Sequence, residues 1–166
     1  MTNTHAQTTR SWLGIPYATA ERFRRPNLLP FNPGLSYDKK GPAPLQAGDT
    51  SWLEADNGLS EDCLNLNVWA PEDAGDKPLP VIVYIYGGGF EMGSNTQTTS
   101  NASGLAATGR AIGVSLNYRL GPFGWLSLSQ YGGCSRTPPT LDCRTSLPHF
   151  SGCGRTSLAS AGTLKT

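Results

Sequence analysis

Residues 81–90 read VIVYIYGGGF, an apolar run that ends in three consecutive glycines. A run rich in β-branched and aromatic residues, apolar on both faces, is typical of a strand in the middle of a sheet that is covered on both sides. Taken alone, the glycines fit a plain flexible loop. Directly after such a strand they also let the backbone bring bare N–H groups close to a developing oxyanion, which indicates acyl transfer.

Composition excludes several classes of partner. The chain has 166 residues, 37% of them hydrophobic, which is enough for one ordinary domain. Its 13 basic and 12 acidic residues create no field that favours nucleic acid or an anionic membrane. No stretch approaches the run of about twenty apolar residues that a bilayer span needs, and residues 1–10 lack an apolar signal segment. We therefore expect a cytoplasmic chain.

The cysteines form no recognisable pattern. Cys63 stands alone, and the other three crowd the end of the chain at irregular spacing: Cys134, Cys143 and Cys153. This spacing predicts neither a disulfide framework nor a zinc site. We expect no metal.

The order of the elements predicts an α/β fold. Residues 64–69 alternate apolar and polar side chains, which predicts a strand with one buried face that stops at Pro71. Residues 99–110 predict a short helix capped by Gly109, and residues 111–117 predict a second buried strand. A strand, a helix and a strand make a crossover unit, so residues 81–86 and 111–117 should pair in parallel. Residues 26–44, rich in proline and glycine, predict an irregular surface connection that is a poor place for a core.

Four segments together resemble one family, the type-B carboxylesterases, which are cholinesterase-like members of the α/β-hydrolase superfamily. They are GIPYA at 14–18 with Arg22, Phe23 and Pro26 following, EDCLNLNVW at 61–69, YGGGF at 86–90 and NYRLGPFG at 117–124. The resemblance covers about the first 130 residues. It implies the N-terminal portion of an α/β-hydrolase fold: antiparallel entry strands, then the first parallel crossover, in an incomplete sheet with an open apolar edge.

The resemblance also implies roles for single residues. It makes Gly88 and Gly89 the donors of the oxyanion hole, with Gly87 shaping the turn. It makes Glu61 and Asp62 structural, through salt bridges or loop hydrogen bonds, where a solvated acidic pair is the alternative. Arg119 is expected to be a buried structural arginine rather than a substrate clamp. The implied chemistry is hydrolysis of a small-molecule ester through an acyl-serine, without metal or organic cofactor.

The chain departs from the family pattern in what it lacks. It contains no Gly-x-Ser-x-Gly, and His5 and His149 lie where a solvated side chain is the simplest interpretation, so none of the catalytic triad is present. We expect a chain truncated before the nucleophile and inactive as written. The alternative is a non-catalytic, cholinesterase-like binding protein, although nothing in the sequence names its partner.

Two further departures concern cysteine and asparagine. Residues 41–44 read GPAP where secreted members have Gly-Pro-x-Cys, so Cys63 lacks that partner, as expected in a reducing compartment. Asn65 stands where the family usually has an aromatic residue, a change without obvious catalytic meaning.

Residues 132–166 differ in character from residues 1–131, which we interpret as the N-terminal part of a carboxylesterase domain. Ser, Thr, Arg, Pro and Cys dominate, which predicts a loop or a disordered end. Residues 157–166, SLASAGTLKT, can be encoded by nucleotides that one base earlier read IASFGGDPKN, a string similar to the family's segment before the nucleophile. Our hypothesis is a one-base change of frame between residues 131 and 140. Sequencing the transcript across this junction tests it, and a message without such an alternative reading would refute it.

Overall fold

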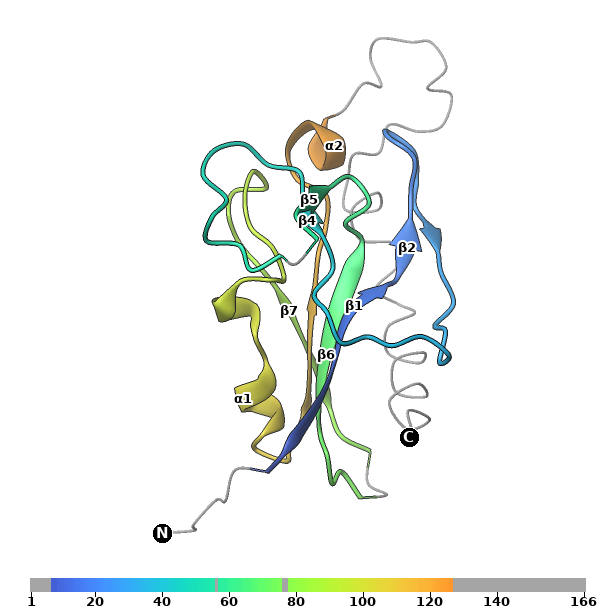
Figure 1. The fold of residues 1–166 in the computed structure, drawn as a ribbon, viewed down its shortest axis with the longest axis vertical. Helices are drawn as coiled ribbons and strands as arrows, with labels where there is room; N and C mark the ends of the chain where they lie inside the picture. Colours follow the sequence, from blue (N-terminus) through green and yellow to red (C-terminus); the bar gives the residue numbers. More distant parts are fainter. Residues whose placement is uncertain (1–6, 56, 76–77, 127–166) are drawn as a thin grey trace.

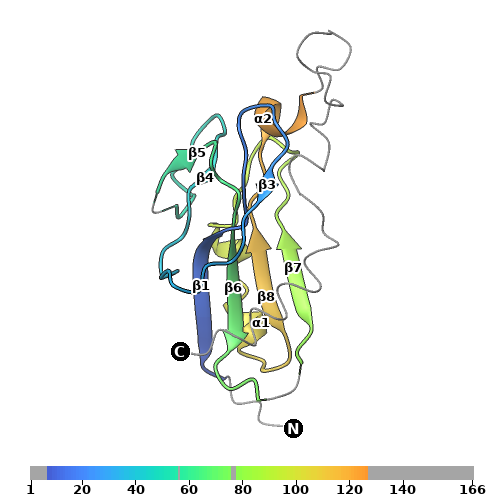
Figure 2. The ribbon, with the colours of Figure 1, turned by 90° about the vertical axis from the view of Figure 1, so that its right-hand side faces the viewer.

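The computed structural model describes residues 7–55, 57–75 and 78–126. Within them, four strands form the main sheet in the order β1-β6-β8-β7, and Figure 2 shows them side by side. These strands are β1 (Thr9–Pro16), β6 (Asn65–Pro71), β7 (Val81–Ile85) and β8 (Ile112–Leu116). Two small sheets pair β2 (Ala18–Thr19) with β3 (Asn27–Leu28) and β4 (Ala43–Pro44) with β5 (Leu59–Ser60).

The main sheet is mixed, which makes the fold α/β. Strands β1 and β6 are antiparallel, as are β6 and β8, whereas β7 and β8 are parallel. The predicted parallel pairing of the two apolar stretches is therefore confirmed. Strand β6 ends at Pro71, as predicted, and Pro71 itself still pairs with Thr9.

The crossover between β7 and β8 contains η1 (Thr98–Ser100) and α1 (Ser103–Ala106), and α2 (Gly121–Trp125) follows β8. Helix α1 is shorter than the predicted range: it ends at Ala106 with Ala107 as its C-cap, so the expected cap, Gly109, lies in the turn beyond it. This glycine has a φ of +70°, and its N–H donates to the carbonyl of Ala106.

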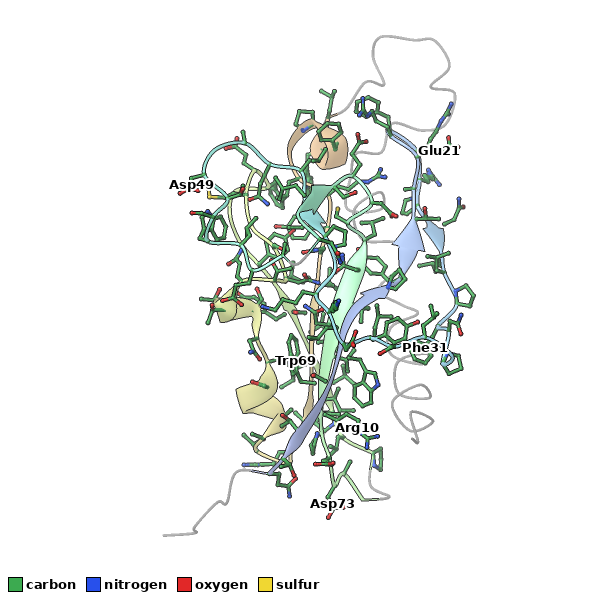
Figure 3. All side chains as sticks on the ribbon, viewed as in Figure 1. Arg10, Glu21, Phe31, Asp49, Trp69 and Asp73 are labelled. Atoms are coloured by element: carbon green, nitrogen blue, oxygen red, sulfur yellow. The ribbon has the colours of Figure 1, made fainter. Side chains whose placement is uncertain are left out.

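Helix α1 covers one face of β6 and β8 (Figure 1). Gly113 permits this contact, because a Cβ there would lie 2.4 Å from the Cβ of Ala102. Trp69, opposite Gly113 in register, is buried on β6 and is labelled in Figure 3. On β7 and β8 themselves the core includes Val81, Val83, Ile112 and Val114.

The structure corrects the expected position of the first apolar strand. Residues 81–86 were expected in the middle of the sheet, but β8 lies there and β7 forms an edge. All five residues of β8 are buried, whereas β7 leaves Ile82, Tyr84 and Ile85 exposed. An apolar run shows that a strand needs covering on both faces, but it does not rank strands by their place in the sheet. Among the described strands, β7 has a neighbour on one side only, and its apolar side chains are partly exposed.

In the alternating segment 64–69, the polar side chains of Asn65 and Asn67 lie in the interior. Asn65 is 4% exposed and Asn67 is fully buried, so the usual reading of polar positions as solvent-facing is wrong here. The side-chain amide of Asn65 donates to the carbonyl of Pro42 at 2.9 Å. Asn67 accepts from the N–H of Gly14 at 2.8 Å and donates to the carbonyl of Asn95 at 3.2 Å. These bonds make burial of the two amides possible.

Asn117, directly after β8, completes this network. Its Oδ1 accepts from the N–H of Asn95 at 2.7 Å and from the hydroxyl of Ser94 at 3.2 Å, and its Nδ2 donates to the carbonyl of Pro42 at 3.1 Å. The amide of Asn95 donates in turn to Asn65 at 3.1 Å. Burial of Pro42's neighbours Ala43 and Pro44 also shows that the end of the 26–44 connection belongs to the interior. We call Asn65, Asn67, Asn95 and Asn117 the asparagine cluster.

Replacing Asn117 by alanine should destabilise the chain by about 2–4 kcal/mol, because it leaves the buried partners of the amide unpaired. Urea unfolding followed by tryptophan fluorescence measures the change. Asn57→Ala is the matched control, since this amide is exposed and donates only to the carbonyl of Lys40. Equal effects of the two substitutions would contradict the importance of the cluster.

Candidate functional site

The loop after β7 has a backbone that only glycine adopts easily. Gly88 has a φ of +133° and Gly89 a φ of +63°, and Phe90 continues at +63°. A Cβ on Gly88 would lie 2.0 Å from the carbonyl oxygen of Met92, whereas a Cβ on Gly87 would meet nothing within 4 Å. The backbone therefore requires glycine at Gly88 and Gly89. At Gly87, which was expected to shape the turn, neither the φ angle nor the available space requires one.

Hydrogen bonds hold this loop without using the candidate donors. The carbonyl of Gly88 accepts from the N–H groups of Glu91 at 3.1 Å and Met92 at 3.2 Å, and the carbonyl of Phe90 accepts from Gly121 at 2.7 Å. Among the described residues, nothing accepts a hydrogen bond from the N–H of Gly88 or Gly89. Two neighbouring donors are thus left for a ligand.

A cleft of about 310 Å³ lies over these glycines. Its described lining consists of the loop and of residues around it: Ile85, Tyr86, Gly87, Gly88, Gly89, Phe90, Tyr118 and Trp125. None of these side chains is charged at neutral pH. The glycine N–H groups are therefore bordered by an apolar, aromatic wall, in which a hydrogen bond to an anion is stronger than in water.

A tyrosine pair forms the base of the cleft. The rings of Tyr86 and Tyr118 stack with their centroids 4.5 Å apart and their planes 13° from parallel. The Tyr86 hydroxyl donates to the carbonyl of Tyr118 at 3.1 Å, and the Tyr118 hydroxyl donates to the carbonyl of Tyr86 at 2.9 Å. Burial raises the pKa of both hydroxyls, so they remain neutral donors.

The motifs in the sequence do not by themselves mark this pair of tyrosines as part of the site. A signal was present, because each tyrosine directly follows one of two strands that were expected to be parallel neighbours. The carboxyl ends of such strands meet at the same edge of the sheet.

Helix α2 supplies the side of the cleft. The ring of Trp125 lies 4.0 Å from that of Phe90, centroid to centroid, and its Nε1 donates to the carbonyl of Arg119 at 3.1 Å. The ring of Tyr118 meets Trp125 edge-on at 6.3 Å. These contacts connect the glycine loop to the segment after β8.

The sequence model of the carboxylesterase family matches residues 1–135. The chain belongs to the carboxylesterase family. It is 41% identical over 131 residues to the para-nitrobenzyl esterase of Bacillus subtilis (strain 168), an alignment that covers 72% of this chain and 26% of that protein. It is 39% identical over 131 residues to the acetylcholinesterase of Bungarus fasciatus, covering 71% of this chain and 22% of that protein. The chain spans about a quarter of the length of these curated relatives.

Two family positions have the structural roles expected of them. Arg119 is 3% exposed and donates to the carbonyls of Ala20 and Glu21, as a buried structural arginine does. Glu61 accepts from the Nε of Arg22 at 2.9 and 3.1 Å, and this guanidinium lowers the pKa of the carboxyl. The pair anchors the segment before β6 to the loop after β2.

Asp62 differs from its neighbour. Its side chain is exposed and makes no salt bridge or hydrogen bond with the other described residues, whereas its backbone N–H donates to the hydroxyl of Ser60 at 3.0 Å. Asp62 therefore fits the alternative, a solvated carboxylate, because a bond from the backbone N–H does not depend on the type of residue.

Other predicted features fall on both sides of the described boundary. The segment 132–166, which contains His149 and three of the cysteines, lies outside the described residues, and so does His5. Within the described ranges, no cluster of three or more His, Cys, Asp or Glu side chains could hold a metal ion. No helix in the same ranges has the length and apolar character to cross a membrane.

Cys63 is a free, buried thiol. Burial raises its pKa from an ordinary value of 9.0 to about 12. At pH 8 the folded chain should thus react with iodoacetamide roughly a hundredfold or more slowly at this thiol than the unfolded chain does. Mass spectrometry of the peptide that contains Cys63 measures both rates, the second in concentrated guanidinium chloride.

The same shift gives a pH dependence with a definite sign. Because the folded pKa lies above the unfolded one, the neutral thiol contributes stability at low pH that is lost as the pH rises from about 9 towards 12. Labelling of the native thiol at the unfolded rate would contradict its burial.

Proposed function

We propose that this chain carries the oxyanion-hole half of a carboxylic ester hydrolase site, with the N–H groups of Gly88 and Gly89 as the donors. The observation that carries the proposal is that both glycines line the cleft while neither N–H has an acceptor among the described residues. Membership of the carboxylesterase family supports it. Gly87, which was expected to shape the turn, directly precedes the two donors in the loop.

The proposed fold is the N-terminal portion of an α/β-hydrolase. Strands β1 and β6 are its antiparallel entry strands, and β7 and β8 its first parallel crossover. In this arrangement the glycine loop lies at the carboxyl ends of the parallel strands, which is where sheets of this class bind ligands.

The chemistry follows from the position of the donors. When a serine attacks an ester carbonyl, the oxygen becomes an anion, and two fixed N–H groups stabilise that anion more than the ground-state carbonyl. Each donor contributes about 3–4 kcal/mol to the lowering of the barrier. The neutral tyrosines and Trp125 keep water from competing for these donors, and an uncharged group of a small-molecule ester fits a wall without charged residues.

The nucleophile, the general base and the acid are not among the described residues. The printed sequence has no Gly-x-Ser-x-Gly, so we propose that the 166-residue chain is inactive without further residues. The proposal includes a reducing, cytoplasmic setting, which the free thiol of Cys63 supports. The relatives' names are those of enzymes, and no observation favours a non-catalytic binding role.

A chimera tests the hole. Residues 1–126 of this chain replace the matched segment of the Bacillus subtilis para-nitrobenzyl esterase, and hydrolysis of p-nitrophenyl acetate is measured. Gly88→Ala should lower kcat by about 10²–10³-fold, because it displaces one donor from the oxyanion. Gly104→Ala is the matched control, since its Cβ meets open space away from the cleft and its φ is not left-handed.

Thermal unfolding of each chimera separates a damaged site from a damaged fold. A folded Gly88→Ala chimera that keeps the kcat of the Gly104→Ala protein would overturn the assignment. Turnover by the 166-residue chain above a denatured sample would overturn the proposed inactivity.

A further inference from the structure

Among the described residues, the side chain of Gln46 is the only hydrogen-bond partner of the backbone of Gly93. Its Oε1 accepts from the N–H of Gly93 at 3.0 Å, and its Nε2 donates to the carbonyl of the same residue at 3.0 Å. Nε2 also donates to the carbonyl of Pro44 at 3.1 Å. The amide thus pairs with Gly93 as a residue of a neighbouring antiparallel strand does, through one donated and one accepted bond. Both of its N–H groups are used, which holds the side chain in one orientation.

Gln46 extends from a part of the chain that is itself held in place. It lies two residues after β4, whose two residues are buried and pair with β5. Further along the same connection, Glu54 accepts from the Nζ of Lys40 and from the hydroxyl of Thr98 at 2.6 Å. The connection between β4 and β5 therefore lies against the segment that follows the glycine loop, as Figure 1 shows.

Gly93 has no room for a side chain that could hold it by packing. Its φ is +124°, and a Cβ there would lie 2.3 Å from the ring of Tyr86 and 2.9 Å from the carbonyl oxygen of Gly87. The position of this residue therefore depends on its backbone N–H and carbonyl, which are the two groups that Gln46 binds.

The peptide group between Met92 and Gly93 connects Gln46 to a candidate donor. Because a peptide group is planar, the acceptor that orients the N–H of Gly93 also orients the carbonyl of Met92. Gly88 packs closely on that carbonyl, since a Cβ on Gly88 would lie 2.0 Å from its oxygen. The N–H of Met92 in turn donates to the carbonyl of Gly88 at 3.2 Å. A rotation of this peptide group would thus displace Gly88.

We propose that Gln46 is a positioning residue for the oxyanion hole, which it serves by fixing the peptide group on which Gly88 packs. The inference rests on the proposed function of Gly88 and Gly89. Gln46 is not in the described lining of the cleft, so it acts through the loop rather than on the ester. The donors must point to where negative charge develops, and a displacement of about 1 Å costs about 10²-fold in rate.

The chimera used for Gly88 measures the effect on catalysis. Gln46→Met keeps an unbranched side chain of similar length and removes all three hydrogen bonds. It should lower kcat for p-nitrophenyl acetate about tenfold or more and change KM less than about twofold, because the donors act on the transition state. Gln97→Met is the matched control. This side chain is also half-buried, lies outside the described lining, and accepts only from the hydroxyl of Thr99 among the described residues.

Hydrogen exchange tests the same contact in the 166-residue chain. The amides of Glu91 and Met92 donate to the carbonyl of Gly88, so their protection reports on the loop. Gln46→Met should lower this protection about tenfold or more, whereas Gln97→Met should leave it unchanged. The wild-type chain supplies a test that needs no variant, because the amide of Gly93 should be protected. Free exchange of that amide in the folded wild-type chain would overturn the inference.

The outcomes separate this inference from the proposed function. A folded Gln46→Met chimera with the kcat of the Gln97→Met protein overturns the positioning role, and loss of activity in Gly88→Ala then still supports the oxyanion hole. A higher KM at unchanged kcat also overturns the role, since it assigns Gln46 to binding of the ester. Full activity of Gly88→Ala overturns the proposed function and this inference together, even when exchange shows that Gln46 holds the loop.

Discussion

The asparagine cluster is the constraint on which the rest of the structure depends. Four buried amides connect β1, β6, the segment after the glycine loop and the end of β8. Burying an amide costs free energy unless its hydrogen bonds are made, and among the described residues every side-chain polar atom of the cluster except Oδ1 of Asn95 has a partner, so each amide restricts the position of the others. The register of the strands and the path of residues 93–96 are thereby set together. A sheet held by apolar contacts alone would tolerate small shifts of these segments.

The asparagine cluster also fixes the position of residues at the candidate site. Asn117 is followed by Tyr118, whose hydroxyl holds the carbonyl of Tyr86 at the start of the glycine loop. At the far end of the loop, a Cβ on Gly93 would lie 2.3 Å from the Tyr86 ring, so the chain returns in contact with that ring. The loop is therefore fixed at both ends by groups that the cluster positions. Donors held in this way need no reorganisation when an oxyanion forms.

The sequence predicted what depends on local pattern and missed what depends on packing. The strands at 81–85 and 112–116 and their parallel pairing follow from composition, periodicity and the order of the elements, whereas the expected cap at Gly109 lies beyond the end of α1. The edge position of β7 does not, because residues 81–86 are as apolar as a central strand. Burial of Asn65 and Asn67 could not be predicted from the sequence either, because most of their hydrogen-bond partners are carbonyls and amides distant in sequence. The glycine triplet indicated a hole, but only coordinates show which of its glycines needs a left-handed backbone.

The strained backbone of Phe90 is held by contacts within this chain, so the shape of the glycine loop does not depend on the residues that would complete the site. A phenylalanine at a φ of +63° costs about 1 kcal/mol or more, and its backbone remains there because its carbonyl binds Gly121 and its ring packs on Trp125. Both partners belong to this chain, so the conformation of the donors does not need a nucleophile to be present. The proposed reaction does need one, and Ile85, the last residue of β7, lies in the lining of the cleft. A preformed glycine loop is what the proposed half-site requires, because its electrostatic part then belongs to this chain and its reactive part is supplied by other residues.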